Sequence, residues 1–320
     1  MTIIDISGLI QKAYKKRERL AADHKAYRLF NSDCDGIKGV TIDIYGGYAA
    51  VSWYLESAPA IKEKIVGALA ETLELSGVYE LYRFKSPGCP QNFSLVSGAP
   101  AAEFFAIEED GSKYLCSFAH GQNAGFFIDN RANRVIISET AGGKNVLNMF
   151  SYTGVLSVAA AAGGAVSVTS VDISAAYNKW AKRNLEINGY KAFSETVLTF
   201  DAFDYMNFSA KKGREFDLII IDPPPFAARL DGRPFGARKD YHRLIEAALK
   251  ITSKEATILA LCNMAGYPRG EFAAMLETTL KKSRSGRFKI AEGPKMPPDF
   301  KSPPRNEKLD YLKNYYISVY

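Results

Sequence analysis

Short apolar segments alternate with helical segments from about residue 120 onward, and this alternation constrains the fold more than any other feature of the chain. It predicts βαβ units, a parallel sheet and helices on both faces of that sheet. In open sheets of this kind a ligand binds beyond the carboxyl ends of the strands. The predicted strands are NVLNMF (145–150), VSVTSVDI (166–173), SETVLTF (194–200), FDLIII (216–221) and ATILALC (256–262), with helices at 175–188 and 240–251.

The first 118 residues have a different pattern. Residues 7–30 place apolar and basic side chains at helical spacing, which predicts an amphipathic helix with a basic face. Two runs of alternating polarity then meet at Gly46-Gly47, which is typical of a hairpin, and a helix at 60–75 and strands at 78–84 and 102–109 follow. We therefore expect a basic helical arm at 1–30, a small α+β domain at 31–118 and an α/β domain at 119–320.

Composition excludes several classes of protein. With 320 residues, 47% hydrophobic and 24% charged, the chain falls among ordinary globular proteins rather than disordered or fibrous ones. Four scattered cysteines without a CxxC pair fit neither a disulfide framework nor a zinc site, so we expect no metal and a reducing compartment. No apolar stretch reaches the roughly 20 residues that span a bilayer, and we expect a cytoplasmic protein with no membrane partner.

Charge is unevenly distributed along the chain. The net charge is +6, and residues 1–30 hold seven basic and three acidic side chains, whereas residues 31–119 hold six and twelve. Residues 120–320 hold 28 basic and 20 acidic side chains. The basic surplus at both ends permits a polyanionic partner such as RNA.

Polar residues follow the predicted strands where a ligand is expected. The segment SYTG, residues 151–154, joins a buried strand to a helix of small residues, and this turn either approaches a ligand or serves tight packing. The absence of GxGxxG argues against a dinucleotide site. Asp172 ends the next strand and is expected to accept hydrogen bonds from a ribose, or else to cap a helix. Asp201 follows the third strand and suits an exocyclic amine such as adenine N6, or else lies in a solvated loop.

The segment DPPPF is the most specific of these strand ends. A buried strand brings Asp222 to the sheet edge, and the three prolines that follow form a stiff chain without free N–H groups. Such a carboxylate followed by an aromatic ring suits the binding of a planar base. Cys262 ends the strand ATILALC at the same edge, either as a nucleophile or as an inert buried thiol.

These motifs together resemble a class I S-adenosylmethionine-dependent methyltransferase with a Rossmann-like sheet. They specifically resemble the bacterial large-subunit ribosomal RNA methyltransferases that include the cytosine-C5 enzyme I and the guanine-N7 enzyme K. It rests on HGQNAGFFIDNRANR (120–134), VLNMFSYTGVLSV, VTSVDIS, WAKRNLEINGY, FDLIIIDPPPF, MPPDF and YLKNYYISV, and FNSDCDGIKGVTIDIYGGYAAV is similar to the family's small central domain. Members with the full layout begin with an RNA-binding PUA domain, and residues 1–30 are too few to form one.

The resemblance implies a set of site residues. For the cofactor S-adenosylmethionine these are Phe126, Asp129, Arg131, Asn148, Ser151, Tyr152, Thr153, Gly154, Asp172, Asp201 and Asp222, the last facing the transferred methyl group. Phe126 as a core residue and Arg131 as an ion-pair partner are the structural alternatives. Pro223, Pro224 and Phe226 are expected to bind the substrate, with Tyr267 as a second stacking residue. Expected phosphate contacts are Arg229, Arg233, Arg238, Lys239, Lys281, Lys282, Arg284 and Arg287.

Which atom of the substrate accepts the methyl group depends on whether Cys262 acts as a nucleophile. Cytosine C5 becomes nucleophilic only after a thiolate adds at C6, whereas a guanine nitrogen needs only positioning. We expect the enzyme to methylate a base of ribosomal RNA, with cytosine C5 as the acceptor atom. Asp222 and Cys262 are the expected catalytic residues. The alternatives are guanine N7 or N2 and a small-molecule acceptor; a nicotinamide oxidoreductase and a catalytically silent RNA-binding module fit less well. The oligomeric state, including a homodimer, stays open.

Overall fold

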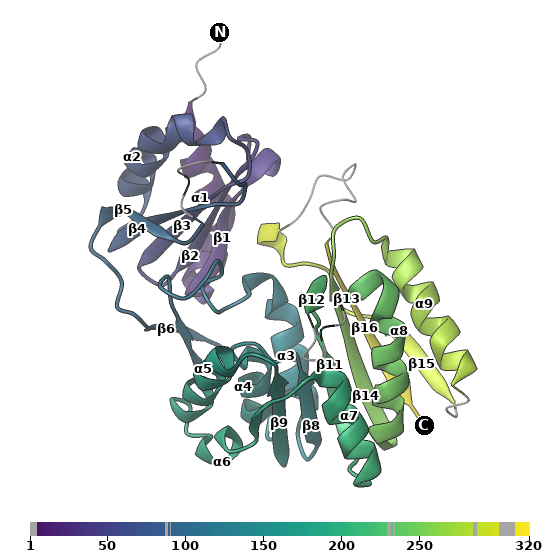
Figure 1. The fold of residues 1–320 in the computed structure, drawn as a ribbon. Helices are drawn as coiled ribbons and strands as arrows, with labels where there is room; N and C mark the ends of the chain where they lie inside the picture. Colours follow the sequence, from purple (N-terminus) through teal and green to yellow (C-terminus); the bar gives the residue numbers. More distant parts are fainter. Residues whose placement is uncertain are drawn as a thin grey trace. The chain divides into compact units, whose positions relative to one another are not determined.

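The computed structural model describes residues 5–86, 89, 91–228, 232, 234–283, 287–300 and 311–320 (Figure 1). The chain forms two compact units. Unit 1 comprises Met1–Asp129 and Pro297–Pro303, and unit 2 comprises Asn130–Met296 and Pro304–Tyr320. Among the described residues no helix is both long enough and apolar enough to cross a membrane.

Unit 1 is built on a five-stranded sheet with the order β1-β2-β3-β4-β5. The predicted hairpin is confirmed, since β2 and β3 pair antiparallel and Tyr45 and Tyr48 face each other across Gly46-Gly47. A helix then returns the chain so that β4 runs parallel to β3. The elements are α1 (Ile6–Asp23), β1 (Ala26–Asn31), β2 (Val40–Tyr45), β3 (Tyr48–Trp53), α2 (Lys62–Thr72), β4 (Gly77–Tyr82), β5 (Ser94–Gly98), β6 (Phe105–Glu109) and β7 (Ser112–Cys116).

Helix α1 is an integral part of unit 1 and differs in this from the separate arm expected at 1–30. Its apolar residues Ile6, Ile10 and Ala13 are buried in the same core as Trp53 on β3. Arg17 is buried on the same helix and pairs with Asp35, with 2.7 Å between Nη2 and Oδ2. Helix α1 ends at Asp23, and the chain continues directly into edge strand β1. Its exposed face keeps the predicted lysines, including Lys12 and Lys15.

The PPDF part of the MPPDF segment, residues 297–300, also belongs to unit 1, although it lies near the end of the sequence. Its residues form the short helix η5 (Pro298–Phe300). Asp299 is buried and accepts a hydrogen bond from the backbone N–H of Arg28, at 2.9 Å. The guanidinium of Arg28 lies 4.2 Å from the centre of the Phe300 ring. Unit 1 is therefore closed by a segment that is 271 residues away from β1 in the sequence.

Unit 2 is the predicted α/β domain, and its Rossmann-like sheet is confirmed. The seven strands have the order β10-β9-β8-β11-β14-β16-β15, and the first five are mutually parallel. Strand β16 runs antiparallel between β14 and β15. The strands are β8 (Asn145–Met149), β9 (Ser167–Asp172), β10 (Val197–Thr199), β11 (Phe216–Ile221), β14 (Thr252–Asn263), β15 (Phe288–Glu292) and β16 (Leu312–Val319).

Helices cover both faces of this sheet (Figure 1). They are α3 (Arg131–Thr140), α4 (Val155–Ala162), α5 (Ala175–Glu186), α6 (Lys191–Ser194), α7 (Ala202–Lys211), α8 (Ala237–Ala248) and α9 (Arg269–Lys282), and a small hairpin pairs β12 (Phe226–Ala228) with β13 (Pro234–Gly236). Strand order reverses at β8, because the chain moves from β8 to β9 and β10 on one side and continues with β11 and β14 on the other. A reversal of this kind opens a crevice at the carboxyl ends of β8 and its neighbours.

Candidate functional site

The loop after β8 has an unusual backbone. Phe150 and Tyr152 have φ values of 58° and 49°, a left-handed conformation that side chains other than glycine rarely adopt. Neighbouring elements hold the loop in place: the N–H of Ser151 donates to the carbonyl of Val171 on β9, at 3.0 Å. The energetically unfavourable backbone conformations therefore lie where the sequence predicts ligand contact, as is common in binding loops.

Gly154 ends this loop and sets the distance between two helices. Its φ is 75°, and a Cβ atom added there would lie 2.8 Å from Cβ of Ala181 on α5. The N-terminus of α4 begins directly after it and has no side-chain cap. Thr153 is fully buried, and its carbonyl accepts a hydrogen bond from Nδ2 of Asn184 on α5, at 2.7 Å. The loop thus brings an uncapped helix N-terminus to the carboxyl end of the sheet.

Asp172 joins the strand end to this loop. One carboxylate oxygen accepts from the N–H of Tyr152 at 2.9 Å and the other from the N–H of Ser174 at 2.8 Å. Burial raises the pKa of Asp172, although both hydrogen bonds act in the opposite direction. Ser174, and not Asp172, caps α5. The capping alternative for Asp172 is therefore wrong, and its contact with a ribose stays a prediction.

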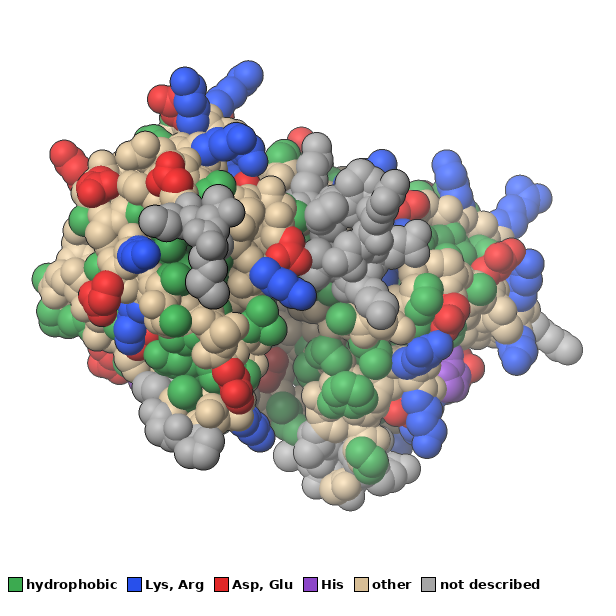
Figure 2. Space-filling view, turned by 90° about the horizontal axis from the view of Figure 1, so that it is seen from above, with side chains coloured by type: hydrophobic (Ala, Val, Ile, Leu, Met, Phe, Trp, Pro, Cys, Tyr) green, Lys and Arg blue, Asp and Glu red, His purple; other side chains and the backbone are tan. Residues whose placement is uncertain are grey.

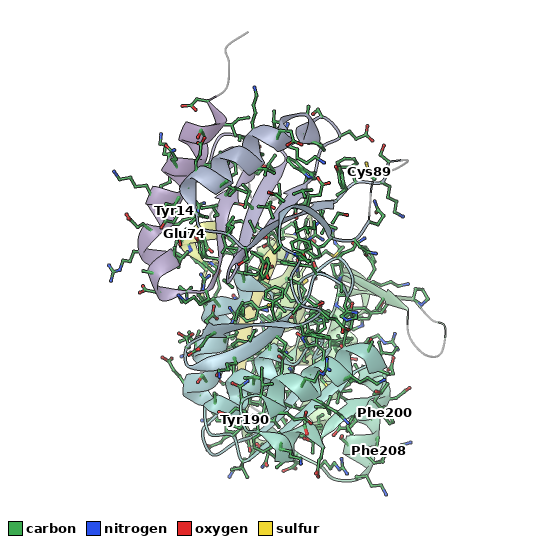
Figure 3. All side chains as sticks on the ribbon, turned by 90° about the vertical axis from the view of Figure 1, so that its left-hand side faces the viewer. Tyr14, Glu74, Cys89, Tyr190, Phe200 and Phe208 are labelled. Carbon is green, nitrogen blue, oxygen red and sulfur yellow. The ribbon has the colours of Figure 1, made fainter. Side chains whose placement is uncertain are left out.

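Asp201 is a helix cap. It is 5% exposed, and its Oδ1 accepts from the N–H groups of Phe203 and Asp204 at the start of α7. The solvated-loop alternative is therefore wrong, and contact with an adenine amine stays a prediction. Phe200 precedes it and is 40% exposed, and its ring centre lies 6.5 Å from that of Phe208 (Figure 3). An exposed aromatic surface thus lies beside the Asp201 backbone.

Two buried oxygens near the loop have no partner among the described residues. They are Oδ1 of Asn148 and Oγ of Ser151. Asn148 donates through Nδ2 to Oγ of Ser157 on α4 at 2.8 Å, and that hydroxyl lies 2.7 Å from Oγ of Ser170 on β9. Buried polar atoms of this kind are costly unless something binds to them. They fit a ligand with several hydrogen-bond donors, such as the amino acid and nucleoside parts of S-adenosylmethionine.

Strand β11 brings Asp222 to the same edge, on the other side of β8. Its Oδ2 lies 3.5 Å from Nδ2 of Asn130. Pro223 is buried and Pro224 is exposed, and the carbonyl of Pro225 accepts from the N–H of Ala237 at 2.9 Å. The three prolines therefore form an ordered chain that connects the sheet to β12.

Phe226 is the most exposed large aromatic residue described in this part of the chain. It is 72% exposed and begins the β12–β13 hairpin. Tyr267, the second expected stacking residue, is 4% exposed and packs on Phe272. Of these two rings only Phe226 is available to a base without rearrangement.

Cys262 lies inside the core. Its side chain is fully buried on β14, and burial raises the pKa of the thiol to about 11, while Lys313 on the paired strand β16 acts in the opposite direction. At neutral pH the group is a thiol and not the thiolate that attacks a base. The catalytic role predicted for Cys262 is therefore not supported by its surroundings.

The HGQNAGFFIDNR motif extends across the boundary between the two units. Phe126 and Asp129 belong to unit 1, whereas Arg131 begins α3 of unit 2. Phe126 is buried, and its ring centre lies 5.0 Å from that of Tyr114, as expected for the core alternative. Arg131 is also buried. Contacts of these three residues with a cofactor stay predictions.

The expected phosphate contacts fall into three groups. Arg238 pairs with Glu271 and Lys281 pairs with Glu277. Lys239, Lys282 and Arg287 are exposed. Arg229, Arg233 and Arg284 lie outside the described residues. On the face drawn in Figure 2, Lys and Arg side chains are interspersed with Asp and Glu. Pairing of this kind reduces the positive field that RNA phosphates would meet.

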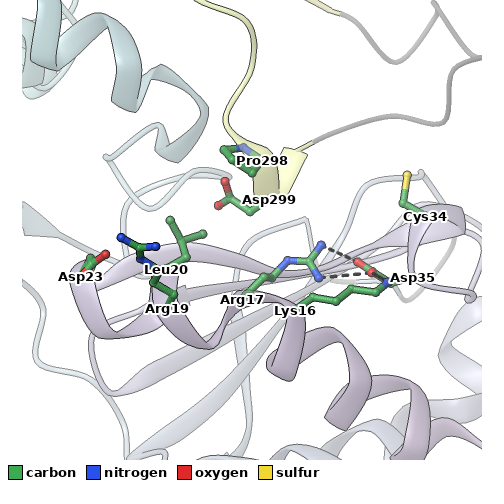
Figure 4. A pocket seen from close by; sticks show the side chains of 9 residues that line it. All are labelled: Lys16, Arg17, Arg19, Leu20, Asp23, Cys34, Asp35, Pro298 and Asp299. Carbon is green, nitrogen blue, oxygen red and sulfur yellow. Dashed lines mark hydrogen bonds and ion pairs between the residues drawn. The ribbon is translucent and has the colours of Figure 1, made fainter.

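A pocket in unit 1 has a similar balance of charge (Figure 4). Lys16, Arg17 and Arg19 line it together with Asp23, Asp35 and Asp299. Asp35 binds both Lys16 and Arg17, so two of these cations are already neutralised. This pocket is therefore poorly suited to an anionic ligand.

Comparison with known proteins agrees with this geometry. The family model of the S-adenosylmethionine-dependent methyltransferases matches residues 79–309. The chain belongs to this family. The protein is thus an S-adenosylmethionine-dependent methyltransferase, and contact of Asn148 and Ser151 with its cofactor stays a prediction.

Individual relatives cover most of the chain. YwbD of Bacillus subtilis, whose name assigns it provisionally to the large-subunit ribosomal RNA methyltransferases, is 36% identical over 95% of this chain and 78% of its own length. Ribosomal RNA large subunit methyltransferase I of Shewanella amazonensis is 31% identical over 87% of this chain and 72% of its own. The crystal structure of SMU.776, which is provisionally described as a methyltransferase and is complexed with SAH (S-adenosylhomocysteine), has a TM-score of 0.87 and 33% identity, covering 98% of this chain and 81% of the other.

Sequence reasoning missed several buried amides of the site. Asn178 on α5 donates to the carbonyls of Asp172 and Leu198, which joins the ends of β9 and β10. Asn184 holds the β8 loop from the same helix. The sequence contains a pattern that could have identified them. Both asparagines lie on the buried face of an amphipathic helix, where a polar residue needs a hydrogen-bond partner.

Proposed function

We propose that this methyltransferase modifies a base of large-subunit ribosomal RNA. The observation that carries the proposal is the pair of carboxylates on the two strands that flank β8: Asp172 at the end of β9 and Asp222 after β11. One carboxylate suits the ribose of the cofactor, and the other lies beside a stiff proline segment and an exposed aromatic ring. The names of the relatives supply the RNA class.

Each residue of the site has a separate role toward the cofactor or the base. Asp172 accepts from the ribose hydroxyls, Asp201 and Phe200 border the adenine, and Asn148 and Ser151 accept hydrogen bonds near the methionine part. When bound, S-adenosylmethionine supplies an activated methyl group, so the protein has to place the acceptor in line and exclude water. Phe226 stacks on the target base, and Asp222 accepts hydrogen bonds from its N–H groups.

For the acceptor atom we propose a guanine nitrogen in place of cytosine C5. Attack at C5 requires a thiolate that reaches C6 of the base. Cys262 is fully buried, and the pKa of its thiol is raised to about 11. A guanine nitrogen has its own lone pair, and the N1–H and N2–H groups of guanine match a carboxylate such as Asp222.

The test compares two cysteine variants. Cys262→Ala is expected to keep methyl transfer to large-subunit ribosomal RNA, apart from the effect of a small cavity on stability, and RNA containing 5-fluorocytidine should form no covalent adduct. Cys116→Ala, which removes an equally buried thiol on β7 of unit 1, is the matched control. Nucleoside mass spectrometry identifies the product. Loss of transfer in Cys262→Ala alone, together with a covalent adduct of the wild type, would restore the C5 assignment.

A further inference from the structure

We propose that Asn133 is a positioning residue that turns the amide of Asn130 so that Asn130 presents an N–H donor to Asp222. This inference rests on the function proposed above and on the expectation from the family resemblance that Asp222 faces the transferred methyl group. The four residues that carry it come from separate parts of unit 2: Asn130 precedes α3, Asn133 lies on α3, Asn314 lies on β16 and Asp222 follows β11. Asn130, Asn133 and Asn314 are all buried.

The direction of each hydrogen bond follows from a backbone carbonyl that can only accept. The carbonyl of Pro294 accepts from Nδ2 of Asn314 at 3.0 Å, which fixes the orientation of that amide. The same nitrogen lies 3.3 Å from Oδ1 of Asn133, so this oxygen must be the acceptor. Nδ2 of Asn133 then donates to Oδ1 of Asn130 at 2.7 Å.

The remaining nitrogen of Asn130 faces Asp222. Nδ2 of Asn130 and Oδ2 of Asp222 are 3.5 Å apart, a separation that often shortens when a substrate completes the site. A donor at this position favours the ionised carboxylate, whereas an acceptor would favour its protonated form. The amide series therefore keeps Asp222 negative where the positive sulfonium would bind.

Two titratable groups that act on Asp222 stay neutral in the pH range of the test. Tyr241 on α8 and Cys262 on β14 interact with it electrostatically, and burial raises the pKa of both. Both stay neutral at pH 8 and below. Lys313 on β16 also acts on Cys262 electrostatically.

The affinity ratio of S-adenosylmethionine to S-adenosylhomocysteine reports the charge of Asp222 without any RNA. The first ligand carries the sulfonium cation and the second is neutral at sulfur, while contacts such as that with Asp172 are common to both. Calorimetry of both ligands from pH 8 down to the lowest pH at which the protein stays folded should show that the preference for the cation falls as Asp222 takes up a proton. The pH midpoint of that fall is the quantity to compare.

Two variants change the donor, and a third is the control. Asn133→Asp keeps the shape, and its carboxylate would accept from Asn314, Tyr316 and Nδ2 of Asn130, so that Asn130 turns its oxygen toward Asp222. Asn130→Ala removes the donor without adding charge. Tyr316→Phe removes a hydroxyl that lies 3.2 Å from Oδ1 of Asn133 but leaves Asn314 to orient it.

We expect both donor variants to move the midpoint upward by about one pH unit, a tenfold change in proton affinity, and Tyr316→Phe to leave it in place. Melting temperatures check folding, and Asn130→Ala carries the test if Asn133→Asp does not fold. Midpoints equal to that of the wild type in the folded donor variants, or an equal shift in Tyr316→Phe, would overturn the proposal. Failure to methylate ribosomal RNA would contradict the proposed function and leave this result standing.

Discussion

Replacement of Gly154 by alanine tests how the β8 loop is held against α5. The left-handed backbone costs a non-glycine residue about 1 to 2 kcal/mol. The new Cβ would also lie 2.8 Å from Cβ and 3.1 Å from Cα of Ala181, and overpacking of this kind adds about 1 to 3 kcal/mol. We therefore expect Gly154→Ala to lower the free energy of unfolding of unit 2 by about 2 to 5 kcal/mol.

Urea unfolding followed by circular dichroism measures this loss. The transition of unit 2 is the one that S-adenosylhomocysteine shifts to higher urea concentration. At one hundred times its dissociation constant the ligand adds about 2.7 kcal/mol to the free energy of unfolding. Gly189→Ala is the matched control, because its φ is 82° and no atom lies within 4 Å of the added Cβ. It should lose only the backbone contribution of about 1 to 2 kcal/mol. Equal losses in the two variants would refute the contact argument.

Two further perturbations test unit 1. Arg17→Met leaves Asp35 buried without its guanidinium and should cost about 3 to 5 kcal/mol at pH 7. Burial raises the pKa of Asp35, but the hydrogen bonds and charge of Arg17 outweigh it and hold the pKa below 3.8, so this stabilisation is present above about pH 4 and is lost as pH falls through the lowered pKa. Urea unfolding at pH 7 and pH 3 should show the difference from wild type shrinking at pH 3, and a constant difference would contradict the ion-pair explanation. Affinity for ribosomal RNA should fall steeply between about 50 and 200 mM salt, and Lys12→Glu with Lys15→Glu on the exposed face of α1 should flatten the slope in fluorescence anisotropy. An unchanged slope would exclude this face from the RNA contact.

The five parallel strands of unit 2 could be predicted because each has an apolar centre and a polar residue at its carboxyl end or within two positions of it, whereas the antiparallel strands β15 and β16 were not predicted. Strand β11 is the clearest example, since Leu218 to Ile221 are all buried and Asp222 follows them directly. The hairpin at Gly46-Gly47 is equally local, because two glycines between alternating runs determine the turn. In both places the information lies within about ten residues of sequence.

Features that depend on distant partners could not be predicted in this way. The amphipathic pattern of α1 indicates an apolar face but not that this face packs into the core around Trp53. The contact between Asp299 and Arg28 joins residues that no local pattern connects. Cys262 ends an apolar strand whether its side chain faces a cleft or the core, and only the packing around β14 distinguishes the two.

Asp172 illustrates why a site residue can have two roles at once. Its carboxylate accepts from the N–H of Tyr152, one of the two left-handed residues of the β8 loop, and each such residue costs about 1 to 2 kcal/mol. The acid predicted to bind ribose therefore also stabilises the loop that is proposed to border the cofactor. Removing Asp172 would weaken binding through the lost ribose contact and through release of the loop, so the loss of affinity in Asp172→Ala exceeds the contribution of one hydrogen bond. A ribose contact alone would leave the stability of the free protein unchanged, whereas the double role lowers it as well.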